Sequence, residues 1–442
     1  MEFVTLPLLI LIIFILYFKV YKDFFTYKSV IPSSWGLLIS LLMYGIFPVG
    51  YLLSVFEGSW PFSYLKLIDK SFFFASNALV FMFFLLYLLF YTIKIPFFCF
   101  EISNKNNNSF IFIFIVIFIV ATCFYLLYVK SYGGWEYVLN NISSIRSGRD
   151  QNKNYLGAFF KMFGYYYNFL YYALLCYILG RYNKFSLTVK IFSVVLFLLF
   201  LLFIVFKSIL DGGRGALIFV FVGSMFCCFI YGKKISIIHL SLLLFLMLSV
   251  ILFGKTHIFQ LYKSSSASFD FKEISYYLIK IFKEFSYPYL SLVNSLYQDE
   301  AGSRFFVDLI SWIFKPFKLL GFDVVDAVSY YNTYLIIGKW DSMIPPGVIA
   351  FWFQQGGIFS IPFGALIVAL IFKVLDKTYL YSIKSKDPFV CSYCIFIVYW
   401  FSNIFNSCDI ALIIQNFTVF IILLFLLCVS GIFKVKLKLL YI

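Results

Sequence analysis

Three arginines stand at positions where their guanidinium groups could bind an anion. Arg146 and Arg149 are three residues apart, across a glycine-containing turn in the segment 130–155. Arg214 follows Asp211-Gly212-Gly213 and opens an apolar run, so the free amides of a helix start would lie beside it. A planar guanidinium binds two phosphate oxygens at once. The pattern favours a phosphate or pyrophosphate site. The simpler interpretations are an Asp211–Arg214 ion pair and, for the other two arginines, solvation or contact with lipid headgroups.

Four further residues could serve the same chemistry. Arg304 is the only arginine in the long segment 255–342. His257 lies near the start of that segment, and histidine titrates near neutrality, which suits a general base, although a lone loop histidine is more often merely exposed. Gln354 and Gln355 interrupt a later apolar run, where their amides could line a sugar-binding surface or bond to neighbouring helices.

The sequence offers no cluster of metal ligands. Cys391 and Cys394 form a Cys-x-x-Cys pair at the start of an apolar run. A metal site needs further ligands, so we interpret the pair as helix-packing residues. We therefore expect a site that uses neither a metal nor a cofactor.

The elements that position these residues must be membrane helices. Of the 442 residues, 63% are hydrophobic and 12% are charged, and the mean hydropathy is +0.95. A soluble domain is about 45–50% apolar and about 25% charged, because a surface in water needs charge. The composition excludes an ordinary cytosolic enzyme, a disordered protein and a secreted disulfide scaffold. It predicts an all-α, polytopic integral membrane protein.

A bilayer core takes about 20 apolar residues per helix, and the chain has eleven apolar runs of roughly that length. They cover residues 3–18, 35–56, 71–93, 110–129, 156–180, 191–210, 214–231, 235–254, 345–372, 389–404 and 413–433. The runs do not alternate between apolar and polar residues, which favours helices over the strands of a β-barrel. We expect helices 1–8 within residues 1–254, including the outer segment 130–155, a large outer loop at 255–342, and helices 9–11 within residues 343–442.

The basic residues predict the orientation of these helices. The odd-numbered loops and the C-terminal tail hold 17 Lys and Arg, whereas the short even-numbered loops hold eight. Cytoplasmic loops of membrane proteins carry the excess of basic residues. We therefore expect the C-terminus in the cytoplasm and the N-terminus outside. The net charge of +15 is then mainly a topology signal and not a nucleic-acid footprint.

The outer segments have the patterns of short helices. In the long one, Asp270-x-x-Glu273 resembles a capping box, and apolar residues recur at helical spacing over 271–285. The stretch 305–320 repeats the pattern. Both predict amphipathic helices that lie at the outer face of the membrane or roof a cavity. In the shorter segment, residues 135–145 predict a short interfacial helix.

Three motifs stand at distinct places in this layout. They are Ile145-Arg146 in the first outer segment, Gly213-Arg214-Gly215-Ala216-Leu217 at the start of the seventh run, and Pro345-Pro346-Gly347 through Gln355-Gly356-Gly357 after the long loop. Together they resemble the bacterial O-antigen polymerases, the oligosaccharide repeat-unit polymerases of the inner membrane. The likeness covers roughly residues 130–372 and lies more in layout than in sequence. It implies a GT-C-like membrane glycosyltransferase.

The resemblance also implies a reaction and roles for the residues. A hydroxyl of a new repeat unit, carried on undecaprenyl pyrophosphate, would attack the anomeric carbon of the growing chain and release its lipid pyrophosphate. Arg214 and Arg146 would contact that pyrophosphate, with Arg149 and Arg304 in support, because cations aimed at a leaving group stabilise its developing charge. His257 would be the base. The implied partners are undecaprenyl-pyrophosphate-linked oligosaccharides, membrane lipids and a chain-length regulator protein, with no nucleic acid.

Other functions fit parts of the same layout. A lipid-linked oligosaccharide flippase would carry buried charges in mid-helix and little mass outside, whereas here the outer loop is long and mid-helix charges are few. An O-antigen ligase shares the broad architecture, and the motifs do not separate it from a polymerase. A membrane acyltransferase would favour several intramembrane histidines, but the chain has two histidines in total.

Overall fold

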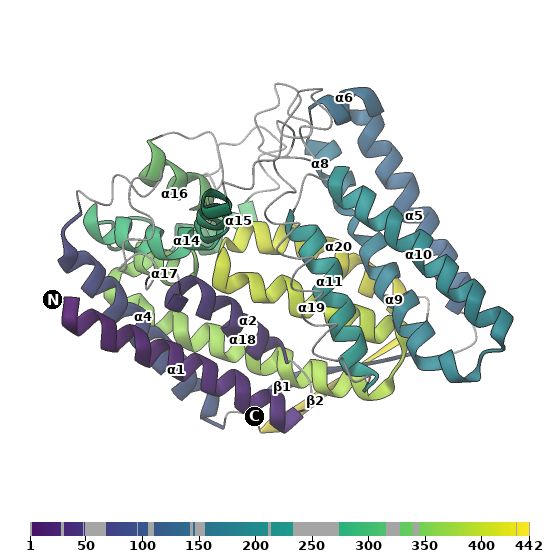
Figure 1. Cartoon of the computed structure of the whole chain (residues 1–442), viewed down its shortest axis with the longest axis horizontal. Helices are drawn as coiled ribbons and strands as arrows, with labels where there is room; N and C mark the ends of the chain where they lie inside the picture. The colour runs from purple at the N-terminus through teal and green to yellow at the C-terminus, as the bar shows by residue number, and fades with distance from the viewer. Residues whose placement is uncertain are drawn as a thin grey trace.

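The computed structural model of the chain is dominated by long helices packed side by side (Figure 1). It describes residues 2–27, 31–46, 48, 68–94, 96–104, 110–141, 145, 155–210, 214–232, 274–314, 328–338, 344–429 and 431–441. The longer helices are α1 (Glu2–Tyr27), α4 (Lys70–Thr92), α5 (Phe110–Ser131), α9 (Tyr165–Arg181), α10 (Leu187–Leu210), α11 (Arg214–Ile230), α14 (Ile274–Tyr297), α18 (Ser360–Ser382), α19 (Pro388–Asn406) and α20 (Ile410–Val429). The shorter ones are α2 (Pro32–Ser40), α6 (Trp135–Asn140), α8 (Tyr155–Met162), α15 (Val307–Phe314), α16 (Val328–Ile337) and α17 (Val348–Gly356). A π-helix η1 (Leu41–Ile46), the 3-10 turns η4 (Tyr182–Lys184), η7 (Gly357–Phe359) and η8 (Ile383–Ser385), and the strands β1 (Pro96–Asn104) and β2 (Phe433–Tyr441) complete the described elements.

Apolar helices of membrane-spanning length confirm the class of the protein. Four stretches of the described chain are long and apolar enough to cross a membrane: Ser71–Thr92, Phe110–Ser131, Leu187–Ser208 and Val348–Ser385. Their outward faces are apolar as well, since Phe112 of α5 is 71% exposed and Leu202 of α10 is 66% exposed. Lipid acyl chains cover such faces, whereas water would not tolerate them over this extent. The chain is mainly helical and has helices that can span a membrane, as predicted.

The predicted apolar runs correspond well to the helices. Helices lie over every run except 235–254, which falls outside the described residues. Shorter apolar helices cover Pro32–Ile46, Val220–Ile230, Pro388–Val398 and Phe417–Val429. The number of eleven spans stays a prediction.

One predicted run, 156–180, is broken into α8 and α9 at Phe163-Gly164. A Cβ atom on Gly164 would lie 3.0 Å from the carbonyl oxygen of Lys161 and 3.1 Å from Cε of Lys207. That close approach favours glycine, because any larger residue would push the two lysines away. The break thus lies where the side chain of Lys207 in α10 approaches the chain.

A second run, 345–372, is broken between α17 and α18, as the Gln-Gln-Gly-Gly interruption predicts. Gly357 has a φ of +62°, a conformation that glycine adopts without strain. After the break, α17 packs against α18: a Cβ on Gly364 would lie 2.4 Å from Cδ1 of the buried Trp352. The two helices approach this closely only because residue 364 has no side chain.

Gly364→Ala is therefore expected to destabilise the protein by about 1–3 kcal/mol, the usual effect of overpacking. Trp352 is 2% exposed, so its ring has no free space into which to move. The measurement is the free energy of unfolding in mixed detergent micelles. Trp352→Leu removes the ring, so Gly364→Ala should have a much smaller effect in that background. Equal effects in both backgrounds would contradict the proposed contact.

The segment 255–342 contains three described helices. α14 and α15 overlap the predicted stretches, and α16 was not expected. The second half of α14 extends beyond the predicted stretch 271–285. Nearly every side chain from Ser286 to Ser295 is buried, on all sides of the helix, and α14 packs against α4, η1 and α17. A helix buried all round lies inside a bundle, so this half of α14 is a core element and not an interfacial one.

A two-stranded antiparallel sheet departs from the all-α expectation. β1 pairs with β2, and the register places Glu101 opposite Lys436 and Ile102 opposite Val435. The three lysines of β2 alternate with apolar residues, which is the period of a strand. The C-terminal segment with these three lysines, which was predicted only as a cytoplasmic tail, therefore forms the strand β2.

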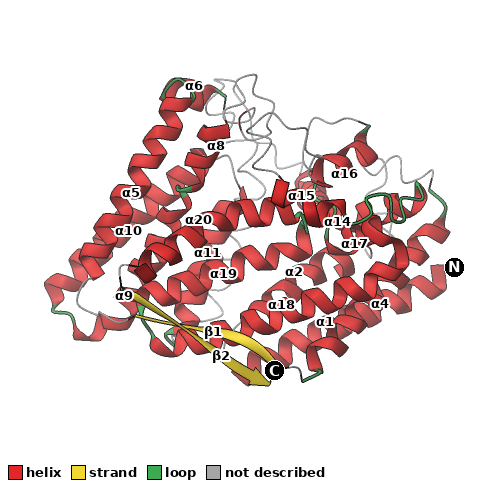
Figure 2. Cartoon of the chain, turned by 180° about the vertical axis from the view of Figure 1, so that it is seen from behind, coloured by secondary structure: helices red, strands yellow, loops and turns green. Residues whose placement is uncertain are grey.

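Two hydrogen bonds between loops show which loops lie at the same end of the bundle. At one end, the amide of Ile102 in β1 donates to Ser382 Oγ at the end of α18 (3.3 Å). At the other end, Ser329 Oγ of α16 donates to Asp409 Oδ2 just before α20 (2.6 Å). The first contact joins two odd-numbered loops and the second joins two even-numbered ones. The sheet lies along the lower edge in Figure 2, and α14 to α17 lie together above it. Which end faces the cytoplasm stays a prediction.

Candidate functional site

A polar cluster lies where the segment 255–342 contacts the break after α17. The turn that precedes α15 docks there through its backbone: the amides of Gly302 and Arg304 donate to the carbonyl oxygens of Phe353 (3.1 Å) and Gln354 (2.9 Å). These are among the last four carbonyls of α17, where the helical pattern of hydrogen bonds ends. The break thus provides the acceptors that hold the turn. The Arg304 cluster, as we name it, comprises Ser295, Glu300, Arg304, Asp308, Tyr331, Gln354 and Gln355.

A two-point ion pair forms the centre of the cluster. Arg304 Nε donates to Asp308 Oδ2 (2.9 Å) and Nη2 donates to Oδ1 (2.6 Å). Gln355 Nε2 donates to the same Oδ2 (2.8 Å). The side chains of Arg304 and Asp308 are 11% and 4% exposed. Charges removed from water to this degree persist only when they are paired and hydrogen-bonded.

The two glutamines extend the cluster into the helix bundle. Both are fully buried, and Gln354 Nε2 donates to Ser295 Oγ of α14 (2.9 Å). Their Oε1 atoms have no hydrogen-bond partner among the described residues. Buried polar atoms without partners are uncommon. Two such acceptors on adjacent residues could each take a hydrogen bond from a further donor.

Tyr331 covers Arg304 from the side of α16. Its ring centroid lies 4.8 Å from the guanidinium carbon, within the range of a cation–π contact. Its hydroxyl donates to Glu300 Oε2. Burial raises the pKa of Tyr331, and the hydrogen bond to Glu300 raises it further. Tyr331 therefore stays protonated at neutral pH and acts here as a hydrogen-bond donor.

An apolar surface adjoins the polar cluster. Phe305, in the docked turn, is 79% exposed, and Phe359, in η7, is 94% exposed. The turn and η7 come close because Gly356 and Gly357 have no side chains: their Cβ atoms would lie 3.2 Å from Phe306 and 3.4 Å from Ala301. Exposed aromatic residues in a membrane protein contact lipid chains or an apolar part of a ligand.

The structure brings three of the seven predicted site residues together: Arg304, Gln354 and Gln355. Arg214 is the first residue of α11, as predicted. The structure describes its backbone but not its side chain. The remaining three, Arg146, Arg149 and His257, fall outside the described residues. Because Asp308 already pairs with Arg304, a direct contact between Arg304 and pyrophosphate stays a prediction.

Four members of the cluster are not among the predicted site residues: Ser295, Glu300, Asp308 and Tyr331. The spacing Arg304-x-x-x-Asp308 is the i,i+4 spacing of helical ion pairs, so Asp308 had a local signal. No local sequence pattern indicated Ser295 or Tyr331, because the residues that they contact are remote in the chain.

Comparisons with protein-family models, with curated proteins and with solved structures find no match to this chain. Within the described residues, no three His, Cys, Asp or Glu side chains come together as metal ligands. Evidence on function therefore comes from the site itself.

Proposed function

We propose that the chain is a membrane glycosyltransferase that polymerises oligosaccharide repeat units carried on undecaprenyl pyrophosphate. It would act without a metal ion at the periplasmic face of the bacterial inner membrane. The N-terminus would lie in the periplasm and the C-terminus, with β2, in the cytoplasm, in agreement with the excess of basic residues in the odd-numbered loops.

The observation that carries the proposal is the Arg304 cluster beside an exposed apolar surface. The cluster supplies a cation, carboxylates and amides at the end of a membrane helix, where ionisable groups are rare and usually functional. Phe305 and Phe359 supply apolar contact next to it. A lipid-linked sugar presents the same two chemistries, a polar head of phosphates and hydroxyls and a long hydrocarbon chain.

In the proposed reaction, the bond between the anomeric carbon and the pyrophosphate oxygen of the donor breaks. A new glycosidic bond forms to a hydroxyl oxygen of the acceptor, whose proton passes to a base such as His257. The lipid pyrophosphate leaves with its charge facing Arg214 and Arg146, assisted by Arg149. Arg304, held by Asp308, keeps the turn on α17, and the buried amides of Gln354 and Gln355 support that turn from the side of the bundle through Ser295 and Asp308.

Deleting the gene in its host bacterium tests the function. We expect lipopolysaccharide on a gel to show the core with a single repeat unit and no ladder, because one unit would still be exported and ligated. Restoring the gene should restore the ladder. Loss of every repeat would favour a flippase or a ligase instead. An unchanged ladder would exclude all three functions.

A further inference from the structure

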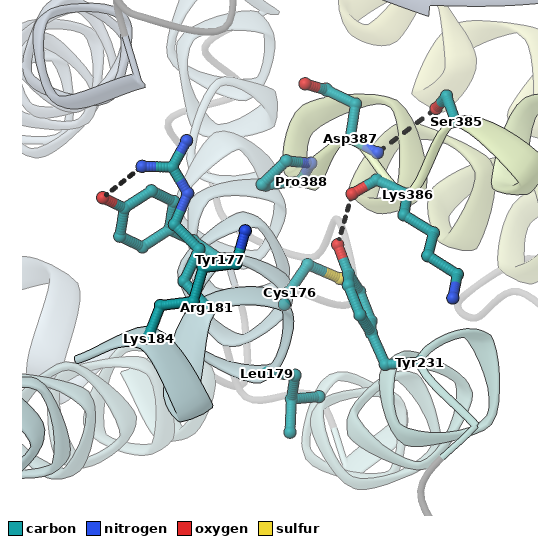
Figure 3. A pocket seen from close by; sticks show the side chains of 11 residues that line it. Cys176, Tyr177, Leu179, Arg181, Lys184, Tyr231, Ser385, Lys386, Asp387 and Pro388 are labelled. Atoms are coloured by element: carbon teal, nitrogen blue, oxygen red, sulfur yellow. Dashed lines mark hydrogen bonds between the residues drawn. The ribbon is translucent and has the colours of Figure 1, made fainter.

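A pocket of about 360 Å³ lies at the opposite end of the helices from the Arg304 cluster. It is formed between the end of α9 with η4, the end of α11, and the link between α18 and α19 (Figure 3). The link belongs to the same end of the bundle as β1, which packs on both α18 and α19. Its volume is within the range of small-ligand sites.

Three basic side chains line the pocket: Arg181 and Lys184 on one side, and Lys386 on the other (Figure 3). Arg181 is held in place, because its guanidinium stacks on the ring of Tyr177 at 4.8 Å and Nη1 donates to the hydroxyl of that tyrosine (3.3 Å). Lys386 is held by its backbone, since its carbonyl oxygen accepts a hydrogen bond from the hydroxyl of Tyr231 (2.7 Å). The guanidinium of Arg181 and the backbone of Lys386 are thus fixed in place.

The one acidic residue among the lining residues is already engaged elsewhere. Asp387 Oδ1 accepts hydrogen bonds from the amides of Phe389 and Val390 (3.0 Å each), so it caps the first turn of α19. The positive end of that helix offsets the charge of the carboxylate. The pocket therefore keeps a net positive character.

From this geometry we infer that the pocket binds the phosphate group of an anionic phospholipid headgroup. The pocket lies at one end of the long helices, and the headgroups of a bilayer lie at the ends of the helices that cross it. Basic pockets of this kind between membrane helices attract acidic lipids, at roughly tenfold or more per pair of cations. The binding would be independent of the proposed glycosyl transfer, since it involves the other end of the molecule.

Native mass spectrometry of the purified full-length protein tests this inference. The protein is mixed with phosphatidylglycerol, with phosphatidylcholine or with inorganic phosphate, and the bound molecules are counted. The test variant carries Arg181→Gln, Lys184→Gln and Lys386→Asn. Asparagine suits position 386 because the backbone there is left-handed, with a φ of +50°. The control carries Lys94→Gln, Lys434→Gln and Lys436→Gln, which removes the same charge from exposed residues beside or within the sheet.

We expect the wild type and the control to retain phosphatidylglycerol in preference to phosphatidylcholine. The test variant should retain about tenfold less phosphatidylglycerol than the control. Equal retention by the test variant and the control would overturn the inference. A third outcome would also overturn the lipid assignment. If inorganic phosphate binds to the wild type but not to the test variant, and phosphatidylglycerol is not preferred, the pocket is a site for free phosphate. A lower yield of folded test variant would be detected in the same spectra and corrected by comparing only folded protein.

Discussion

Asp308→Ala is expected to lower the free energy of unfolding by about 3–5 kcal/mol, because it leaves a buried arginine without its carboxylate. Asp308 accepts hydrogen bonds from Arg304 at two points and from Gln355 at a third. All three donors would lose their acceptor, and 11% exposure of the Arg304 side chain gives little access to water instead. The measurement is reversible unfolding of the purified protein in mixed detergent micelles.

Two further variants separate the buried charge from other causes. Glu136→Ala removes an exposed carboxylate from α6 and should change stability by less than about 0.5 kcal/mol. Arg304→Met combined with Asp308→Leu removes both charges, and replacing a buried pair by apolar residues is often neutral. The double variant should therefore be more stable than Asp308→Ala alone. A loss from Asp308→Ala no larger than that from Glu136→Ala would show that the ion pair does not hold the turn.

Arg214→Ala is expected to reduce the polymer formed by about 100-fold or more, the usual effect of removing one group that stabilises a charged leaving group. Arg214 is the first residue of α11, so the amides of that helix start lie beside it. The measurement is the lipopolysaccharide ladder in a deletion strain that carries the variant gene, together with the amount of protein in the membrane. Core with a single repeat and no ladder is the expected pattern.

The control is Lys94→Ala, which removes an exposed basic residue beside the sheet, at the opposite end of the helices. It should leave the ladder intact, because the proposed reaction does not involve that end. Arg214→Lys keeps the charge but loses the planar fork, so it should recover only part of the polymer. A normal ladder with Arg214→Ala would remove Arg214 from the site.

The helices were predictable from the sequence because length and apolar composition are local properties. The runs 71–93 and 110–129 coincide with α4 and α5 almost residue for residue. The break at Gly164 was not predicted, because apolar and aromatic residues flank it directly on both sides. The sheet was missed because the partner of each strand lies at the other end of the chain.

The site was predictable only in part. Arg304, Gln354 and Gln355 stood out as polar residues in unusual places, and the structure brings them together. Their contacts with Ser295 and Tyr331 depend on how α14 and α16 pack, which no local pattern specifies. The second half of α14, where Ser295 lies, continues beyond the predicted stretch 271–285 and is buried on every side.

The pairing of β1 with β2 places a constraint on how the protein is made. Ser103 and Lys434, neighbours in the sheet, are 331 residues apart in the chain. A ribosome that has finished β1 must therefore synthesise most of the protein before β2 emerges. Until then β1 is a strand edge without its partner, and such edges invite wrong pairing. The sheet can thus close only after α20, the helix that precedes β2 in the chain, has been synthesised.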